Sequence, residues 1–274
     1  GRTRRLGYGR PTLSSRQMRP DSGSLMTMQL DPAGLNEIRE RFLTVEHDFG
    51  EFGDPDGAYH RNERLYKDEL RRLVGELLPR SLFAGDPAER ADEIAERVKS
   101  LLTRPVGLDG KPQNLMTWRY WTFLREMRET ERASFARAMA DLLFGAGSSG
   151  ARIERFNRSM WPAWKRLAGS GNPYAVTRSF PTFFLMLQNP EHDIYVRTDT
   201  FDRASRKLLG RSVVEYAIFD AAGYEVILDF AGAVRRHLVR WGWSPRELID
   251  VQSFLYVGTI PDEALAAAIA DQAP

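Results

Sequence analysis

The chain of 274 residues contains no cysteine and only four histidines. The lack of cysteine excludes disulfide bonds, thiolate catalysis and zinc sites built from cysteine. No run of about 18 apolar residues occurs, so the sequence predicts no membrane-spanning helix. The arginine-containing start has no apolar stretch behind it, which argues against a secretory signal. We therefore expect a cytoplasmic protein with no membrane partner.

Several catalytic and nucleotide-binding motifs are also missing. The Gly/Ser stretch at 145–150 lacks the GK[ST] ending of a phosphate-binding loop, and no G-x-S-x-G hydrolase elbow occurs. The tripeptide Pro-Asp-Gly at 55–57 is not followed by the E-x-K of a magnesium-dependent nuclease. These absences favour a protein that is not an enzyme and that uses no cofactor.

One repeated motif is a candidate metal-binding site. The tripeptide Glu-His-Asp occurs at 46–48 and again at 191–193. Adjacent residues point in different directions, so neither copy alone is a metal cage, but two copies that met in space would offer histidines and carboxylates. The alternative is that both are solvated loop residues, and we expect His192 to be one. A metal-dependent enzyme therefore stays open as a further hypothesis.

The net charge of +2 is the sum of segments whose own net charges differ in sign. Residues 1–25 carry six arginines against one aspartate, and we expect them to be a disordered basic tail. Met26 and Met28 are candidate start residues of the protein. The remaining body has a charge of −3, with −6 in residues 26–110, +7 in residues 111–180 and −4 in residues 181–274. Only the central block is a candidate footprint for nucleic acid.

Apolar residues recur at spacings of three and four along most of the sequence, which is typical of amphipathic helices. The fold class is therefore predicted to be mainly α: a multi-helix globular protein with at most one or two short strands. A polar loop at 105–114 is the expected internal boundary. It divides the folded chain into an N-terminal helical subdomain (26–110) and a C-terminal helical domain (111–274).

Prolines and capping residues set the expected ends of the helices. The sequences DPAE and SPRE predict helix starts capped by Asp86 and Ser244, each with proline at the first helical position. Pro162 is expected to interrupt a helix that starts near residue 150. The apolar run SFPTFFLMLQNP is expected to be a helix from about Pro181 to Asn189, although a buried strand is the alternative.

The segment NPEHDIYVRTDTFDRASRKLLG at 189–210 is unusually dense in structural signals. Period-2 alternation predicts that Ile194 and Val196 face the core while Tyr195 and Arg197 face outward. Asp199 is expected to cap a helix that starts at Thr200, with Asp202 as an acid in its first turn. Gly210 ends this helix, whose Phe201, Ala204 and Leu208 pack inward and whose outer face is basic.

Aromatic and basic side chains alternate in the central block. Basic groups neutralise phosphates, and aromatic rings stack on unpaired or flipped bases. The alternative is that Trp118 and Trp121 share an apolar helix face with Leu124 and pack in the core. The aromatic residues of the block are Trp118, Tyr120, Trp121, Trp161 and Trp164; its basic residues include Arg119, Arg125, Arg128, Arg152, Arg155, Arg158, Lys165 and Arg166.

Three stretches together carry a resemblance to a known family: NLMTWRYWTFL, RSFPTFFLMLQNPEHDIYVRTDTFDRASRKLLG and SPRELIDVQSFLYVG. They resemble the helical region that precedes the AAA+ motor in McrB-like proteins of modification-dependent restriction and related anti-phage systems. The resemblance covers roughly residues 114–258 and consists of packing and turn residues. The motor itself is absent, because no phosphate-binding loop or acidic Walker-type strand occurs. The resemblance implies a recognition or scaffolding module without nucleotide hydrolysis.

Three functional hypotheses follow. The first is a non-catalytic module of a bacterial DNA-targeting defence system, which contacts DNA or RNA and signals to an effector or motor protein. The second is a protein-interaction module that docks an acidic partner or a subunit. The third is the metal-dependent enzyme. For the first hypothesis, the candidate nucleic-acid-binding residues are Arg119, Arg125, Arg128, Arg197, Arg203, Arg206, Lys207 and Arg211.

Overall fold

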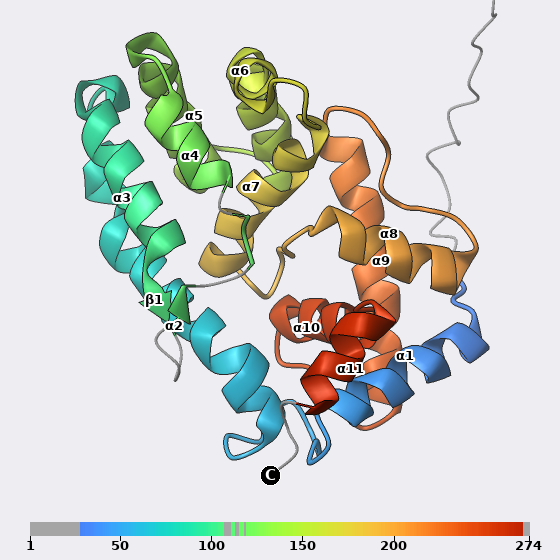
Figure 1. The fold of residues 1–274 in the computed structure, drawn as a ribbon. Helices are drawn as coiled ribbons and strands as arrows, with labels where there is room; N and C mark the ends of the chain where they lie inside the picture. The colour runs from blue at the N-terminus through green and yellow to red at the C-terminus, as the bar shows by residue number, and fades with distance from the viewer. Residues whose placement is uncertain (1–27, 107–110, 113–114, 118, 271–274) are drawn as a thin grey trace, which may run out of the picture.

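The computed structural model describes residues 28–106, 111–112, 115–117 and 119–270. These residues confirm the mainly α fold (Figure 1). No helix in the described ranges is long and apolar enough to cross a membrane. The predicted tail at 1–25 and Trp118 lie outside the described residues. The helices are α1 (Pro32–Val45), α2 (Leu65–Leu77), α3 (Ala91–Thr103), α4 (Arg119–Glu126), α5 (Glu129–Phe144), α6 (Ser149–Ala168), α7 (Tyr174–Gln188), α8 (Thr198–Leu209), α9 (Ala221–Arg240), α10 (Leu248–Gly258) and α11 (Asp262–Ala270).

Short irregular elements complete the architecture. A π-helical turn (His60–Arg64) leads into α2, and 3-10 turns cover Arg80–Phe83 and Pro87–Arg90. The two strands β1 (Pro105–Val106) and β2 (Lys111–Pro112) pair antiparallel, with Pro105 opposite Pro112. The prediction of one or two short strands is therefore confirmed for the described chain.

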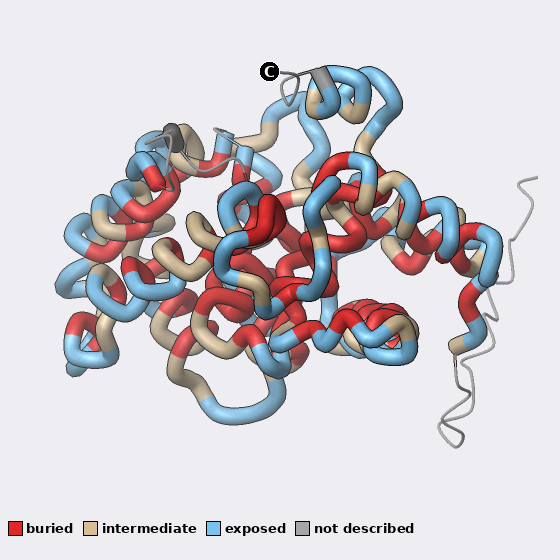
Figure 2. The backbone as a smooth tube through the Cα atoms, turned by 90° about the horizontal axis from the view of Figure 1, so that it is seen from below, coloured by how far each residue is buried: buried red, intermediate tan, exposed pale blue. Residues whose placement is uncertain are grey.

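Helix α7 lies at the centre of the molecule. All its residues from Val176 to Leu187 are buried, and it packs against α2, α5, α6 and α8. Figure 2 shows buried backbone in the interior and exposed turns on the outer helices. The Phe180 ring lies 5.5–5.8 Å from the rings of Phe135, Phe156 and Trp164. Trp164 is therefore a core residue and is not available for stacking on a ligand.

Pro181 lies inside α7, so the prediction that this helix starts near Pro181 is wrong. Proline has no N–H to donate to the carbonyl four residues earlier, which is that of Thr177. The Thr177 carbonyl instead accepts a hydrogen bond from Nδ2 of the buried Asn157 at 2.7 Å. Because a side chain supplies the missing donor, the helix continues through the proline and begins at Tyr174.

Pro162 does not interrupt its helix either. Helix α6 runs without a break from Ser149 to Ala168. Its buried face continues across the proline, because Phe156, Met160 and Trp164 all have no exposed surface. Packing of this apolar face outweighs the one hydrogen bond that the proline removes.

The two capping predictions differ in outcome. Asp86 accepts a hydrogen bond from the Ala88 N–H at 3.1 Å and so caps the 3-10 turn that leads into α3. Ser244 is not a cap: it has a φ of +48°, and α10 begins at Leu248. The buried Asp250 carboxylate reaches back instead, accepting from the Arg246 N–H at 2.7 Å. This acid, inside the helix, fixes where the helix starts.

The first of the described helices packs against the last ones. Helix α1 contacts α8, α10 and α11, and α2 contacts α7. Figure 1 shows α1 beside α10 and α11. The predicted division of the folded chain at residue 110 remains a prediction. The aromatic rings that join the first 60 residues to the last 32 are Phe42, Phe49, Phe52, Tyr59, Trp243 and Phe254.

A polar network lies between the start of α2 and α10. The Asp250 carboxylate accepts from the Tyr59 hydroxyl at 2.6 Å and from Arg64 Nη1 at 3.1 Å. Lys67 has no exposed surface and donates to the Ser253 hydroxyl at 2.7 Å. Buried charges are tolerated only when they are paired in this way. The network therefore fixes α2 against α10.

Glu46 belongs to the same buried region. It is 1% exposed and accepts a hydrogen bond from Asn62 Nδ2 at 3.2 Å. Burial raises the pKa of the Glu46 carboxyl to about 7, and repulsion from Glu63 adds to the effect. The Glu46 carboxyl is therefore a proton-binding group near neutral pH in the folded protein.

Candidate functional site: a cleft lined by arginine and tyrosine

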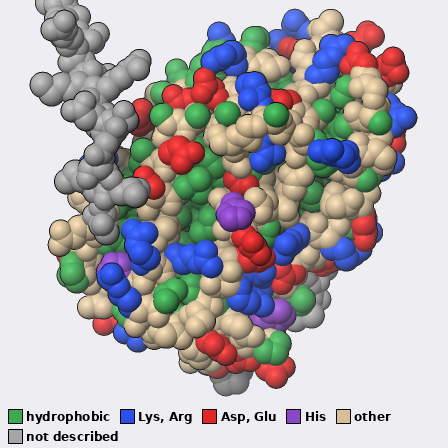
Figure 3. Space-filling view, turned by 180° about the vertical axis from the view of Figure 1, so that it is seen from behind, with side chains coloured by type: hydrophobic (Ala, Val, Ile, Leu, Met, Phe, Trp, Pro, Cys, Tyr) green, Lys and Arg blue, Asp and Glu red, His purple; other side chains and the backbone are tan. Residues whose placement is uncertain are grey.

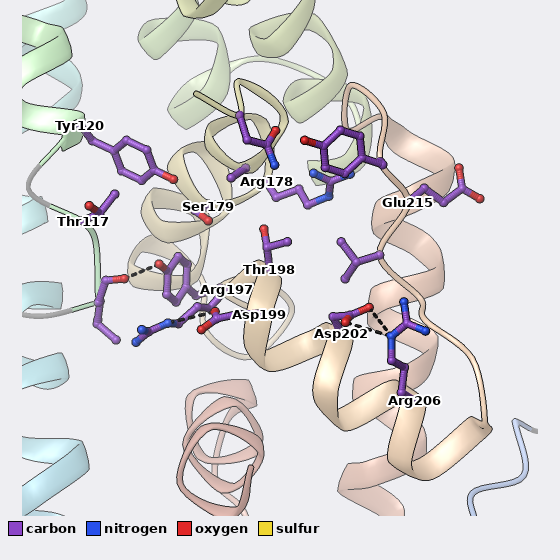
Figure 4. A pocket seen from close by; sticks show the side chains of 16 residues that line it. Thr117, Tyr120, Arg178, Ser179, Arg197, Thr198, Asp199, Asp202, Arg206 and Glu215 are labelled. Atoms are coloured by element: carbon purple, nitrogen blue, oxygen red, sulfur yellow. Dashed lines mark hydrogen bonds and ion pairs between the residues drawn. The ribbon is translucent and has the colours of Figure 1, made fainter. Parts of the chain in front are cut away.

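A cleft of about 620 Å³ lies between α4, α7, α8 and the segment at 212–216 (Figure 4). We call it the central cleft. A neighbouring hollow of similar volume adjoins it. The two share Thr117, Tyr120, Asn172 and Ala175 as lining residues. This size falls in the range of clefts that hold small molecules or one unit of a polymer.

The segment at 193–197 forms one wall of the cleft and is held by side chains. The Ile194 N–H donates to the Tyr224 hydroxyl at 3.0 Å. The Val196 N–H donates to the Thr182 hydroxyl at 2.9 Å, and the Ser179 hydroxyl donates to the Val196 carbonyl at 3.2 Å. No described strand pairs with this extended segment. Side-chain hydroxyl groups therefore make the hydrogen bonds that its backbone N–H and C=O groups need.

The predicted outward position of Tyr195 is wrong. Tyr195 is 1% exposed, and its hydroxyl donates to the Leu115 carbonyl. Ile194 and Val196 are also buried, as predicted. The alternation fails because the segment is covered on both sides, by α7 and by the chain around Leu115. Burial raises the pKa of the Tyr195 hydroxyl, so this group stays neutral.

Asp199 does not cap α8, which corrects the prediction of a helix start at Thr200. The helix begins at Thr198 with Arg197 before it, and no side chain caps its first N–H groups among the described residues. The Asp199 carboxylate pairs with two guanidinium groups instead, at 3.2 Å from Arg197 Nε and 3.4 Å from Arg203 Nη1. Gly210 ends the helix with φ +69°, as predicted.

The predicted basic residues of α8 are mostly paired within the protein. Arg203 also donates to the Thr259 carbonyl at 2.7 Å, and Arg206 lies 3.0 Å from Asp202. Lys207 lies 2.5 Å from Glu37 of α1. Arg211 is exposed beyond the helix end. Of the predicted residues on this segment, Arg197 and Arg206 line the central cleft.

The three predicted arginines around α4 are exposed. Arg119 lines the neighbouring hollow. The Arg125 guanidinium lies 5.7 Å from the Trp121 ring and 3.5 Å from Glu126. Arg128 precedes α5, and its N–H donates to the Glu131 carboxylate at 2.8 Å. The structure therefore does not gather these side chains with those of α8 into one site.

The other basic residues of the central block also have nearby partners. Arg155 lies 2.7 Å from Asp141, and Arg158 lies 2.7 Å from Glu154. Arg152 donates to the Leu142 carbonyl at 2.8 Å. On the face shown in Figure 3, acidic and basic side chains are interspersed. Asp141 and Glu154 belong to this block, so its charge of +7 already includes these two pairs.

Arg178 is a cleft residue that sequence reasoning did not select. It is 2% exposed, and no described carboxylate lies within ion-pair distance of it. Nη1 donates to the Tyr174 carbonyl at 2.9 Å and Nη2 to the Ala217 carbonyl at 3.0 Å, while Nε has no partner. Burial lowers the pKa of this guanidinium. An arginine inside an apolar helical run was the available sequence signal.

Three aromatic rings form a row that ends at the cleft, where Tyr216 is the ring that lines it. The rings of Trp161 and Tyr174 stack with centroids 5.2 Å apart. The Tyr174 and Tyr216 centroids are 4.9 Å apart, and Tyr216 is 74% exposed. Lys165 lies 5.6 Å from the Trp161 ring. We call Trp161, Tyr174 and Tyr216 the aromatic ladder. Tyr216 lines the cleft and offers a ring for stacking.

The two Glu-His-Asp tripeptides have unlike surroundings. Asp193 is fully buried, where it accepts from the hydroxyls of Ser149 and Tyr224, each at 3.0 Å. Burial raises the pKa of Asp193. Asp48 accepts from the Ala58 N–H at 2.8 Å in a separate loop, and His192 is exposed in a turn. No three His, Asp or Glu side chains in the described ranges are placed to hold a metal ion.

Comparison of the chain with protein-family models, with curated proteins and with solved structures finds no match.

Proposed function

We propose that the chain is a non-catalytic recognition module that binds nucleic acid with unpaired bases at the central cleft. The observation that carries this proposal is the aromatic ladder, which ends in the 74%-exposed ring of Tyr216 at a cleft of about 620 Å³. Stacking of a base on an aromatic side chain contributes about 1–3 kcal/mol and tolerates any base sequence. Arg197 and Arg206 line the same cleft, each paired with an aspartate, and each guanidinium can share its donors between that aspartate and a phosphate.

The pairing of surface arginines favours unpaired bases over duplex DNA as the ligand. A protein that tracks a duplex backbone neutralises many phosphates with unpaired Lys and Arg side chains. Here Arg203, Arg206 and Lys207 already contact acids of the protein. We therefore expect stacking to supply much of the affinity. With about three phosphate contacts, the logarithm of the affinity should fall with the logarithm of salt at a slope of about −2.

The biological setting that we propose is a DNA-targeting defence system, in which the module signals to an effector or motor protein. This part of the proposal rests on the resemblance of residues 114–258 to the region that precedes the motor in McrB-like proteins. In such a setting, recognition by this chain and chemistry by its partner are divided between two proteins.

Fluorescence anisotropy with labelled single-stranded and duplex oligonucleotides tests the proposal. The protein is the full chain in which the six arginines of residues 1–25 are replaced by serine, so that the tail charge does not contribute. We expect tighter binding of the single strand, and at least a tenfold loss with Tyr216→Ala. Val239→Ala is the matched control, because Val239 is 56% exposed on α9 and does not line the cleft.

Two results would contradict the proposal. The first is the absence of single-strand binding at low salt by the serine-substituted chain, with DNA and with RNA. The second is equal affinity of the Tyr216→Ala and Val239→Ala proteins for the single strand. Circular dichroism of both variants confirms that each is folded, so that a loss of binding reports on the ring.

A further inference from the structure

Three arginines and three acids line the central cleft, so their charges balance in number, but only two of the arginines form ion pairs. Arg197 is paired with Asp199, and Arg206 is paired with Asp202 (Figure 4). Glu215 is exposed to water and makes no ion pair with any residue that the structure describes. What remains is the buried guanidinium of Arg178, on which the charge of Glu215 acts only from beyond ion-pair distance.

The environment of Arg178 is unusual for a buried cation. Burying a charge is costly unless it is paired, and backbone carbonyls compensate it only in part. Two carbonyls, those of Tyr174 and Ala217, accept hydrogen bonds from its terminal nitrogens. Nε has no acceptor. The Phe219 ring lies 5.6 Å from its Cζ atom. The cleft wall therefore carries a positive charge that Glu215 compensates only from beyond ion-pair distance, in a setting where water screens it weakly.

A second group at the same cleft also lacks a partner. The hydroxyl oxygen of Thr198 is buried and has no hydrogen-bond partner in the described structure. Thr198 is the first residue of α8, a helix of 12 residues whose N-terminus no side chain caps. Figure 4 shows Thr198 pointing from the start of α8 toward the side of the cleft that holds Arg178. A hydroxyl group without a hydrogen-bond partner and helix N–H groups without a cap can both donate hydrogen bonds to a bound anion.

The aromatic ladder lies next to this pair of groups. Arg178 Nη2 bonds the carbonyl of Ala217, the residue that directly follows Tyr216. The guanidinium thus anchors the segment that presents the Tyr216 ring. The positive charge of Arg178 is thus bound to the backbone next to the residue that carries the exposed ring, an arrangement that matches the phosphate and the base of one nucleotide.

We infer that Arg178, Thr198 and the start of α8 form a phosphate subsite, which takes the phosphate of a nucleotide whose base stacks on Tyr216. This inference rests on the proposed function and makes it more specific. The ligand class is a nucleotide, either free or as a unit of a single strand. Two acids of the cleft, Asp199 and Asp202, do not oppose it strongly, because each is paired with its own arginine. The third, Glu215, is exposed to water, which screens its repulsion of a phosphate.

Isothermal titration calorimetry with thymidine 5′-monophosphate and with thymidine tests the subsite at constant ionic strength, on the same full chain with serine in place of the six arginines of residues 1–25. We expect the monophosphate to bind at least tenfold more tightly, and inorganic phosphate to compete with it. Thr198→Val and Arg178→Lys should each reduce this preference severalfold. Arg211→Gln is the control, because Arg211 is exposed and does not line the cleft.

The comparison of nucleotide with nucleoside on this serine-substituted chain tests the subsite without any substitution in the cleft. The inference therefore remains testable even if a cleft variant fails to fold. Equal affinity for the nucleotide and the nucleoside, or no binding of the monophosphate at millimolar concentration, overturns the subsite. A single-stranded oligonucleotide separates this outcome from failure of the proposed function. Strand binding that needs Tyr216 without a phosphate preference refutes the subsite alone. A phosphate preference without strand binding refutes nucleic-acid recognition alone and assigns the cleft to free nucleotides.

Discussion

Replacing Asn157 by alanine is expected to destabilise the protein, because it removes the hydrogen-bond donor of two carbonyls that lie far apart in the sequence. Asn157 Nδ2 donates to the Thr177 carbonyl at 2.7 Å and to the Phe219 carbonyl at 2.8 Å, and the side chain has no exposed surface. Each buried carbonyl left without a donor costs about 1–3 kcal/mol. The amide oxygen of Asn157 has no partner among the described groups, so its removal offsets one such cost. The net loss should be about 1–3 kcal/mol.

The proline in α7 allows a sharper form of this test. Pro181→Ala supplies the N–H that the Thr177 carbonyl would otherwise receive in a regular helix. In the Asn157→Ala background this N–H satisfies a carbonyl that has lost its donor, whereas in the wild type the carbonyl is already satisfied. The two substitutions should therefore couple favourably by about 1 kcal/mol.

Urea unfolding followed by far-ultraviolet circular dichroism measures both quantities. Asn36→Ala on the exposed face of α1 is the matched control and should change stability by less than about 0.5 kcal/mol. An Asn157→Ala effect as small as the control would refute the donor role. Additive effects of Asn157→Ala and Pro181→Ala would show that Asn157 does not replace the missing proline N–H.

Three further predictions concern the region where α1 and α2 meet α10. The raised pKa of Glu46, about 7 in the fold against 4.5 ordinarily, means that the native state binds more protons than the unfolded state between these values. Stability from this group should thus fall by about 3 kcal/mol as pH rises from 4.5 to above 7, and Glu46→Gln should remove this slope in urea unfolding at several pH values. Asp250→Ala removes the acceptor of Tyr59 and Arg64 and should cost about 3–5 kcal/mol; a loss below 1 kcal/mol in the same assay would contradict the network. A methyl group at Gly258 would lie 2.7 Å from the Ile38 carbonyl oxygen. Gly258→Ala should therefore lower the unfolding free energy by about 1–3 kcal/mol. An unchanged melting temperature would contradict this prediction, because it would show that α1 and α10 can move apart at no cost in stability.

Helix periodicity was sufficient to predict the fold class and most helices, because each amphipathic face repeats within a short window of sequence. The two helix starts that failed depend on side-chain partners, one distant and one local. Pro181 is accommodated by Asn157, 24 residues earlier in the sequence, so this compensation leaves no local pattern. Helix α10 starts late because the Asp250 carboxylate, inside the helix, accepts from the backbone N–H of Arg246, four residues earlier.

The candidate site was predicted less completely for a related reason. A sequence shows which residues are basic, but it does not show which acids neutralise them, such as Glu37 for Lys207 across 170 residues. Arg178 was overlooked because the sequence does not show whether an arginine within an apolar helix is buried without a carboxylate at ion-pair distance. Only that arrangement makes it a candidate site residue. The aromatic ladder joins Trp161 and Tyr174 to Tyr216 through packing alone.

The packing of α1 on α10 and α11 has a consequence for synthesis of the protein on the ribosome. The Arg41–Asp262 ion pair spans 221 residues, which take about 10–45 s to translate at about 5–20 residues per second. During this interval the apolar face of α1, including Ile38 and Phe42, has no native partner from α10 to cover it. Of the described helices, α1 is therefore synthesised before all the others but is fully covered only after α10 has been made, and we expect its apolar face to be a binding segment for chaperones on the nascent chain.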